Sequence, residues 1–373
     1  MVKIAEREFD EKLKNIKANG GKLYSISKCN TIDGCQYEAF LTYIKHIKGK
    51  DNCYSLLGTK THDTLQAIID GTATEKDLTP ALQSELDDLD ILGISFPKDR
   101  NGGDGIKDRW IADMSHFCNS FIKPKGEFET EQLCIYKISD TRYVQGYIDL
   151  IKHNKDGTIS IYDWKTSSQF ASKDLTHHGR QLAIYKAAKE EEGYKVKTTA
   201  WIMLKYASVS YMGKSRCNSK KETLQTKIIE RSKIVQELAP DIEYRLQNSG
   251  YDELDIECMI HQSLENNSLN NLPESIKNAY TIKPYVRKYD VTKDIEEEAI
   301  NYINSQADLF ESKSDMEDEW SHRNFTRKLK SGKEIEDTFY CNCLCGHGNM
   351  CKYIKEHNDL RESKQFDDES GLF

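Results

Sequence analysis

The sequence lacks any run of about 18 or more consecutive apolar residues, the least that a membrane-spanning helix needs. Its first residues, MVKIAEREFDEKLK, are charged from the start and lack the apolar core of an export signal. Hydrophobic residues make up 38% of the chain and charged residues 31%, which indicates a large solvated surface. We therefore expect a cytoplasmic protein with no membrane contact.

Two further absences narrow the function. No G-x-x-x-x-G-K-(S/T) loop occurs, so the chain carries no helicase motor of its own. No internal repeat and no low-complexity block are present.

The formal net charge of −8 argues against nucleic acid as a partner, because phosphate binding requires lysine and arginine. That objection applies only to the whole molecule, since a binding site responds to the local field.

Eleven cysteines are present, and four of them lie in the short segment FYCNCLCGHGNMC: Cys341, Cys343, Cys345 and Cys351, with His347 among them. A disulfide framework is typical of small secreted domains, which this chain does not resemble. Thiolates this close together need either a metal or oxidation. A four-ligand zinc site and an iron–sulfur cluster are the two metal interpretations.

The middle of the chain predicts the order β-β-β-α-β. Short runs rich in Ile, Tyr, Val and Thr are separated by turn signals and indicate three antiparallel strands, at 127–138, 141–154 and 157–166. A helix follows at about 177–192, and a strongly apolar run at 197–208 has the length of a buried strand. Helical patterns precede this region, including one at 57–71 that Gly71 would end and a polar stretch at 72–126. Residues 217–340 are charged and expected to be mainly helical, with an extended patch near 281–292, and the tail after Cys351 is polar.

A pair of carboxylates and a lysine converge on two of the predicted strands. Asp163 and Lys165 are two apart on one strand and should project from the same face, and Asp149 lies on the neighbouring strand across a tight turn. Two adjacent carboxylates repel unless a cation joins them, and Mg²⁺ or Mn²⁺ prefers such oxygen ligands. This set suits metal-assisted phosphodiester hydrolysis. The alternative is a surface hairpin whose charged groups are merely solvated.

Four short motifs occur together in one order: Gly58-Thr-Lys-Thr-His62, Gly146-Tyr-Ile-Asp149, Asp163-Trp-Lys165 and Gln181-Leu-Ala-Ile-Tyr185. In this order and spacing the chain resembles the RecB-like branch of the PD-(D/E)XK nucleases, over about residues 25–210. Each motif alone is common, whereas the four in sequence are specific. The resemblance implies an α/β, restriction-endonuclease-like core, with a central mixed sheet flanked by helices and large helical additions.

The resemblance also implies roles for individual residues. His62, Asp149 and Asp163 would bind the catalytic metal with the backbone carbonyl of Trp164, and an acid one strand earlier, Glu131 or Glu129, would be a further ligand. Lys165 would orient or activate the attacking water. Gln181 and Tyr185 would position DNA or the active-site helix. Taken alone, His62 is more commonly a capping or core histidine, and only the full set of motifs favours the ligand role. His177 and His178 could contact phosphate or only begin a solvated helix.

A subset of these nucleases, the AddB-type helicase–nucleases and the CRISPR adaptation nucleases, carries a [4Fe–4S] cluster. Its first cysteine precedes the nuclease histidine and three more lie near the C-terminus. Here Cys35, or Cys29 in its place, fits the first position, and Cys345 and Cys351 match the last pair. The middle ligand would be Cys341 or Cys343, because position 342 is Asn and no C-x-x-C occurs. Zinc is the alternative. Such a cluster would tie the first helices to the last segment.

Basic residues are unevenly distributed. The window 201–235 contains eight basic residues against two acidic ones: Lys205, Lys214, Arg216, Lys220, Lys221, Lys227, Arg231 and Lys233. Tyr206 and Tyr211 lie among them and could stack on bases. A second patch comprises Arg323, Arg327, Lys328, Lys330 and Lys333. Either run could contact DNA or form an ordinary solvated face.

From the sequence we expect four segments. Residues 1–56 would be helical and supply a cluster cysteine, 57–212 would form the nuclease core with a helical insertion at about 72–126, 213–340 would be helical and charged, and 341–373 would hold the cysteine-rich segment and tail. The expected function is that of a Mg²⁺- or Mn²⁺-dependent DNA exonuclease in recombination, repair or phage DNA metabolism. We expect it in a bacterial or phage-infected cell, where a helicase or other recombination protein could be its partner. The alternatives are a non-catalytic DNA-binding or assembly module of the same fold and a zinc-stabilised RNA-binding protein.

Overall fold

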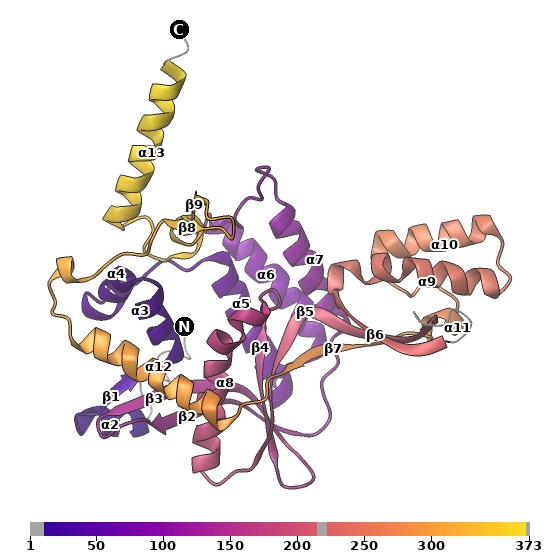
Figure 1. The fold of residues 1–373 in the computed structure, drawn as a ribbon. Coiled ribbons are helices and arrows are strands. Elements are labelled where there is room, and N and C mark those ends of the chain that lie inside the picture. Colours follow the sequence, from indigo (N-terminus) through magenta and orange to yellow (C-terminus); the bar gives the residue numbers. More distant parts are fainter. Residues whose placement is uncertain (1–10, 215–221, 371–373) are drawn as a thin grey trace.

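The computed structural model describes residues 11–214 and 222–370. A seven-stranded mixed sheet runs through the protein, and a separate two-stranded hairpin follows near the C-terminus (Figure 1). The strands are β1 (Lys22–Tyr24), β2 (Glu127–Lys137), β3 (Arg142–His153), β4 (Ile159–Lys165), β5 (Val196–Lys214), β6 (Glu222–Glu230), β7 (Thr281–Lys288), β8 (Thr326–Lys328) and β9 (Glu334–Glu336). The mixed central sheet flanked by helices confirms the expected fold class.

The helices fall in groups before, between and after these strands. They are α2 (Glu11–Ala18), α3 (Ile26–Gly34), α4 (Gln36–Ala39), α5 (Cys53–Asp70), α6 (Leu78–Ile91), α7 (Gly105–Ser120), α8 (Leu175–Glu191), α9 (Ile234–Asn248), α10 (Glu253–Asn266), α11 (Glu274–Lys277), α12 (Lys293–Glu311) and α13 (Lys352–Ser370). Among the described residues, no helix combines the length and apolar character needed to cross a membrane.

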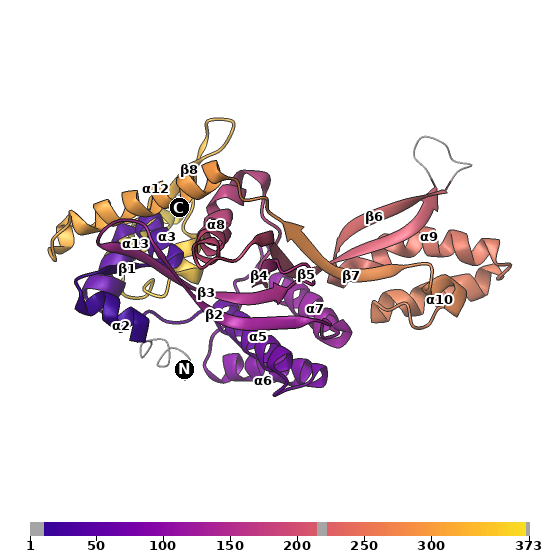
Figure 2. The same ribbon diagram turned by 90° about the horizontal axis from the view of Figure 1, so that it is seen from below.

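Helices cover both faces of the sheet (Figure 2). Helices α5, α6 and α7 pack on one face through a core that includes Leu57, Met114 and Trp164. Helix α8 packs on the opposite face over Ile161 and Trp201, and α12 lies against α8 beyond it. Apolar residues at helical spacing in α5 and α8 and at strand spacing in β4 produce these two layers.

The sheet is forked beside β3. On one edge, β3 pairs antiparallel with β2 along nearly its whole length. On the other edge, residues 142–144 pair in parallel with β1, and residues 150–153 pair antiparallel with β4. Among the described strands, none pairs with residues 145–149 on that second edge. We call this gap between β1 and β4 the fork. It leaves the second edge of β3 without a described partner strand along the whole G-x-I-D motif, residues 146–149.

Two local expectations change. Helix α5 begins at Cys53, where Asn52 forms a capping box with Ser55, so His62 lies in mid-helix rather than at a helix start. Residues 222–230 form strand β6 instead of helix, because they pair antiparallel with the distal half of β5. That half of β5, β6 and β7 carry α9, α10 and α11 outward as an arm (Figures 1 and 2).

The N-terminal and C-terminal segments pack on each other. Phe40 stacks at a tilt against Trp320, with ring centroids 5.6 Å apart, and both side chains are buried. Two glycines let the chains cross closely, since a β-carbon on Gly346 would lie 3.0 Å from the Cα of Gly49. Aromatic packing thus joins regions about three hundred residues apart without a covalent link among the described residues. Beyond this contact, α13 projects from the body (Figure 1).

Candidate active site

The predicted carboxylates and lysine meet at the fork in the sheet. The ammonium nitrogen of Lys165 lies 2.6 Å from Oδ2 of Asp163. Oδ2 of Asp149 accepts a hydrogen bond of 2.8 Å from the backbone N–H of Trp164, which fixes this carboxylate beside the D-x-K strand. Both carboxylates are almost fully buried, with 8% of Asp149 and 2% of Asp163 exposed. The structure therefore brings the two acidic motifs together.

A hydrogen-bonded chain connects helix α8 to this centre. Nζ of Lys165 lies 3.5 Å from Oε1 of Gln181, whose Nε2 donates to the hydroxyl of Tyr185 at 2.8 Å. That hydroxyl donates in turn to the carbonyl oxygen of Tyr147 at 2.7 Å, within the open edge of β3. Gln181 and Tyr185 are four residues apart, so one face of α8 presents both. Helix α8 thus contacts both β4 and β3 through these two residues.

His62 approaches from the opposite helix layer. Its Nδ1 lies 3.6 Å from Oδ2 of Asp149, and its ring meets the indole of Trp164 edge-on with centroids 5.7 Å apart. The imidazole also lies within hydrogen-bonding reach of the Trp164 backbone. His62, Asp149 and the backbone of Trp164 are thus mutual neighbours.

The structure separates the two acids of β2. Glu131 has a left-handed backbone, with φ of +50°, which a non-glycine residue adopts at a cost on the order of 1 kcal/mol. It lies across from Asp149 in the strand register and lines the same cavity. Glu129 instead bonds to Nε2 of His153 at 2.6 Å. Of the two acids, Glu131 is therefore the one at the fork, and its backbone is the distorted one.

Burial and like charge shape the protonation of these groups. Burial, followed by the charge of Asp163, raises the pKa of Asp149 well above its ordinary value. Burial lowers the pKa of His62 to about 4, so its imidazole is neutral at neutral pH. Burial also lowers the pKa of Lys165, but the charges of Asp163 and Asp149 outweigh this and leave its pKa raised. The carboxylate pair thus favours an added positive charge.

The residues at the fork have the chemistry of a site for a hard divalent cation. Oδ2 of Asp163 is buried without a hydrogen bond of suitable geometry among the described residues, although the Lys165 ammonium is close. Carboxylate oxygens, a neutral imidazole and a backbone carbonyl are all available there. As the side chains are placed, however, no three His, Cys, Asp or Glu residues of the described chain form a metal-binding group.

A cavity of about 630 Å³ opens over these residues. Besides the motif residues, its walls include groups that the motifs did not indicate: Leu13, Lys14, Lys17, Ser25, Ser27, Asp63 and Gln145. Most of them come from α2 and the start of α3. No local pattern in the sequence indicates that residues 13–27 reach the fork, because the parallel pairing of β1 with β3 brings them there.

The α/β fold with its mixed central sheet is of the restriction-endonuclease type. The family model of the PD-(D/E)XK nuclease superfamily matches residues 24–279. The chain belongs to this superfamily, whose nucleases usually use Mg²⁺ or Mn²⁺. No curated protein matches the chain closely enough to add to this comparison.

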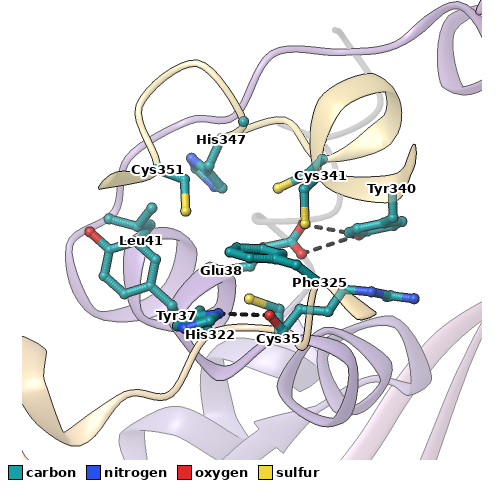
Figure 3. Close-up of a pocket in the computed structure, with 13 residues that line it drawn as sticks. Cys35, Tyr37, Glu38, Leu41, His322, Phe325, Tyr340, Cys341, His347 and Cys351 are labelled. Carbon is teal, nitrogen blue, oxygen red and sulfur yellow. Dashed lines mark hydrogen bonds between the residues drawn. The ribbon is translucent and has the colours of Figure 1, made fainter. Parts of the chain in front are cut away.

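The cysteines divide between two places. Cys35, Cys341, Cys345 and Cys351 line one small pocket together with Glu38 and His347. The side chain of Cys35 enters from the N-terminal segment, and those of Cys341 and Cys351 enter from the C-terminal segment (Figure 3). Cys343 is exposed and lies near Cys53 outside this pocket, and Cys29 is buried between α3 and α12. All ten described cysteines are free thiols.

The sulfur pocket has the donor types of a thiolate metal site. Burial raises the pKa of Cys341 to about 11 and that of Cys345 to about 12, so these thiols stay protonated at neutral pH unless a cation displaces the proton. Glu38, which accepts hydrogen bonds from the hydroxyl of Tyr340, lies beside them (Figure 3). The residue types fit a four-sulfur site, while their present spacing forms no metal-binding group.

Part of the first basic window is buried, and the buried residues cannot form a DNA-binding surface. Lys205 and Arg231 are buried, at 8% and 3% exposure, with Lys205 beside Asp113 and Arg231 bonded to the carbonyl of Leu204. Tyr206 and Tyr211 are buried in the core and cannot stack on bases. Arg216, Lys220 and Lys221 lie outside the described residues. The two buried basic residues and the two tyrosines therefore serve packing.

The second basic patch divides between two environments. Arg323 lies over the ring of Tyr340 at 4.8 Å, beside the sulfur pocket. The remaining residues lie on the β8–β9 hairpin, where Arg327 is 3.6 Å from Asp337 and Lys328, Lys330 and Lys333 are exposed. His178 stacks on Phe170 with centroids 3.7 Å apart, a packing role, and His177 contacts it edge-on.

Proposed function

We propose that the fork is the active site of a Mg²⁺- or Mn²⁺-dependent deoxyribonuclease that acts as an exonuclease. The observation that carries this proposal is the convergence of Asp149, Asp163 and Lys165 in one cavity, with His62 and Glu131 on its walls. Membership of the nuclease superfamily supports the reaction class. The preference for DNA ends rests on the resemblance to the RecB-like branch.

Each residue has a definite task in this proposal. The side chains of His62, Asp149, Asp163 and Glu131 and the Trp164 carbonyl would hold the divalent cation. When bound, this cation supplies Lewis-acid activation of the phosphate and lowers the pKa of a coordinated water. The Lys165 ammonium orients that water and stabilises the charge that develops on the phosphate oxygens.

Gln181 and Tyr185 act on Lys165 rather than on the substrate. The amide oxygen of Gln181 faces the ammonium, and the Tyr185 hydroxyl holds the other end of that amide. Because the Tyr185 hydroxyl is itself anchored to the Tyr147 carbonyl, the rotamer of Gln181 is fixed relative to β3. We assign both as positioning residues for Lys165.

The decisive experiment measures degradation of DNA by the purified protein with Mg²⁺ or Mn²⁺. Lys165→Ala and Asp149→Ala should each abolish cleavage while leaving the thermal unfolding transition cooperative. Lys155→Ala, an exposed position in the β3–β4 turn, is the matched control and should cleave normally. Retained cleavage in both active-site variants would overturn the assignment.

Substrate preference requires separate arms. End-labelled linear DNA and circular DNA, each single- and double-stranded, distinguish an exonuclease, which needs ends, from an endonuclease. A wild-type protein that binds DNA without cleaving it would favour the assembly-module alternative, and binding confined to RNA would favour the RNA-binding alternative. Since the chain has no motor loop, we also propose that it works with a helicase or another recombination protein, testable by assay with and without a motor.

We further propose that Cys35, Cys341, Cys345 and Cys351 hold a [4Fe–4S] cluster, with zinc as the alternative occupant. The gathering of these four sulfurs in one pocket supports this choice over sets that contain Cys29 or Cys343. Its role would be mainly structural, because the pocket lies where the N-terminal and C-terminal segments pack together.

A further inference from the structure

Helix α2 forms part of the wall of the active-site cavity and carries positive charge there, opposite in sign to the carboxylates at the fork. Leu13, Lys14 and Lys17 of this helix all line the cavity. Leu13 is buried, whereas both lysines are exposed. Since Lys14 and Lys17 are three residues apart, they lie on the same side of the helix. The cavity therefore has acidic groups at the fork and two ammonium groups on α2.

The position of α2 is fixed by its attachment to the sheet. The N–H of Gly21 donates to the carbonyl of Ile16 at 2.8 Å, and a β-carbon on Gly21 would lie only 2.5 Å from Cγ2 of Ile16. Lys22 then begins β1, and its N–H donates to the carbonyl of Thr141 at 2.7 Å. Helix α2 therefore follows directly from the β1–β3 pairing that creates the fork.

A carboxylate network on α12 secures β1 in turn. Glu311 accepts hydrogen bonds from Lys22 and Tyr24 of β1, each at 2.7 Å, and from two guanidinium nitrogens of Arg142 at 3.0 Å. These contacts join β1, β3 and α12. The two lysines of α2 are thus carried by a braced element rather than by a free terminal helix.

We propose that Lys14 and Lys17 bind backbone phosphates of the nucleic-acid strand next to the bond that is cleaved. This inference rests on the proposed nuclease function and names the residues that would give it affinity. A strand with its scissile phosphate at the fork places its neighbouring phosphates near the cavity walls. The cation and Lys165 at the fork serve the cleaved phosphate, so the neighbouring phosphates need other positive charges on the cavity wall to retain the strand.

The test compares Lys14→Gln/Lys17→Gln with Lys12→Gln, a matched lysine on the same helix that does not line the cavity. With a single-stranded oligonucleotide and Mg²⁺, we expect KM of the double variant to rise roughly tenfold and kcat to stay within about twofold. The dependence of log affinity on log salt should become shallower by about 1.4, for two lost contacts to single-stranded phosphate. Lys17→Arg should keep most of the affinity, because the charge remains.

The outcomes separate this inference from the proposed function. If the wild type cleaves DNA and the double variant retains both its KM and its salt dependence, the inference about α2 is overturned and the nuclease assignment stands. If the wild type cleaves no nucleic acid, both fall together. If the lysines served only as counter-charges to the carboxylates, thermal stability would fall while the salt dependence stayed the same. Should the double variant not fold, Lys17→Gln alone carries the same comparison.

Discussion

The ring of Tyr185 lies directly against the backbone of Gly146. A β-carbon at position 146 would lie 2.8 Å from Cε1 and 3.0 Å from the hydroxyl oxygen of that ring. This close approach lets the hydroxyl reach the Tyr147 carbonyl while it holds Gln181. The glycine of one motif and the tyrosine of another are therefore two parts of a single contact.

Gly146→Ala should displace Tyr185 and disturb the position of Lys165. We expect a loss of stability of about 1–3 kcal/mol from overpacking and a fall in kcat larger than the change in KM. Enzyme kinetics and denaturant unfolding measure the two effects. In a Tyr185→Ala background the same substitution should cost much less, because the clash is gone. Equal costs in both backgrounds would contradict the contact.

Glu311→Gln should destabilise the protein at neutral pH. Burial raises the pKa of Glu311, but hydrogen bonds from Arg142, Lys22 and Tyr24 outweigh it and lower the pKa to about 2. Since an unfolded glutamate titrates near about 4.3, the stabilisation is complete above that pH and is lost as the pH falls through about 2. We expect a loss of about 1–3 kcal/mol at pH 7, with the gap between variant and wild type closing in acid.

Thermal or denaturant unfolding at several pH values measures this gap. Asp308→Asn is the matched control, because Asp308 also contacts Arg142 at 2.7 Å but is 71% exposed. It should change the stability by less than about 1 kcal/mol. A gap for Glu311→Gln that stays constant from pH 7 to pH 2 would contradict the assigned ionisation.

Arg231→Gln should behave as a core substitution rather than as a DNA-binding one. Its guanidinium donates to the Leu204 carbonyl at 2.8 Å and to the Ser120 hydroxyl at 3.0 Å, and it is almost wholly buried. Loss of these bonds should cost about 2–5 kcal/mol in unfolding free energy. The half-exposed Lys233→Gln should change the free energy of unfolding by no more than about 0.5 kcal/mol. A stable Arg231 variant with weakened DNA affinity would contradict the packing role of Arg231.

Cys341→Ser and Cys343→Ser distinguish the two candidates for the middle cluster ligand. Of these two cysteines, only Cys341 lines the sulfur pocket. Its loss should therefore lower the metal content and the thermal stability, whereas Cys343→Ser should change neither. Anaerobic purification followed by metal analysis and visible absorption spectroscopy measures both, and absorbance in the visible range separates iron–sulfur from zinc. Full metal content in Cys341→Ser would rule out this ligand set.

Much of the central fold could be predicted from the sequence. Turn signals and β-branched runs located β2, β3 and β4, and apolar periodicity located α5 and α8, because these patterns are local. Strand β6 could not be recognised, since its charged and apolar residues at 222–230 match no clear period and only the pairing with β5 makes them extended. The burial of Lys205 and Arg231 could not be predicted for a related reason: net charge along a sequence does not show which cations are buried.

At the site, the sequence alone determined the residue types and their order. His62, Asp149, Asp163, Lys165, Gln181 and Tyr185 form four spaced motifs, and spacing within a helix or a strand fixes which neighbours share a face. Only the tertiary structure decided which acid of β2 lies at the fork, which cysteines share a pocket and that α2 forms a cavity wall. The first depends on the left-handed backbone conformation of Glu131, and the second on the packing of the N-terminal and C-terminal segments. The third depends on the parallel pairing of β1 with β3. All three are long-range or conformational, and short-range sequence patterns carry no information about them.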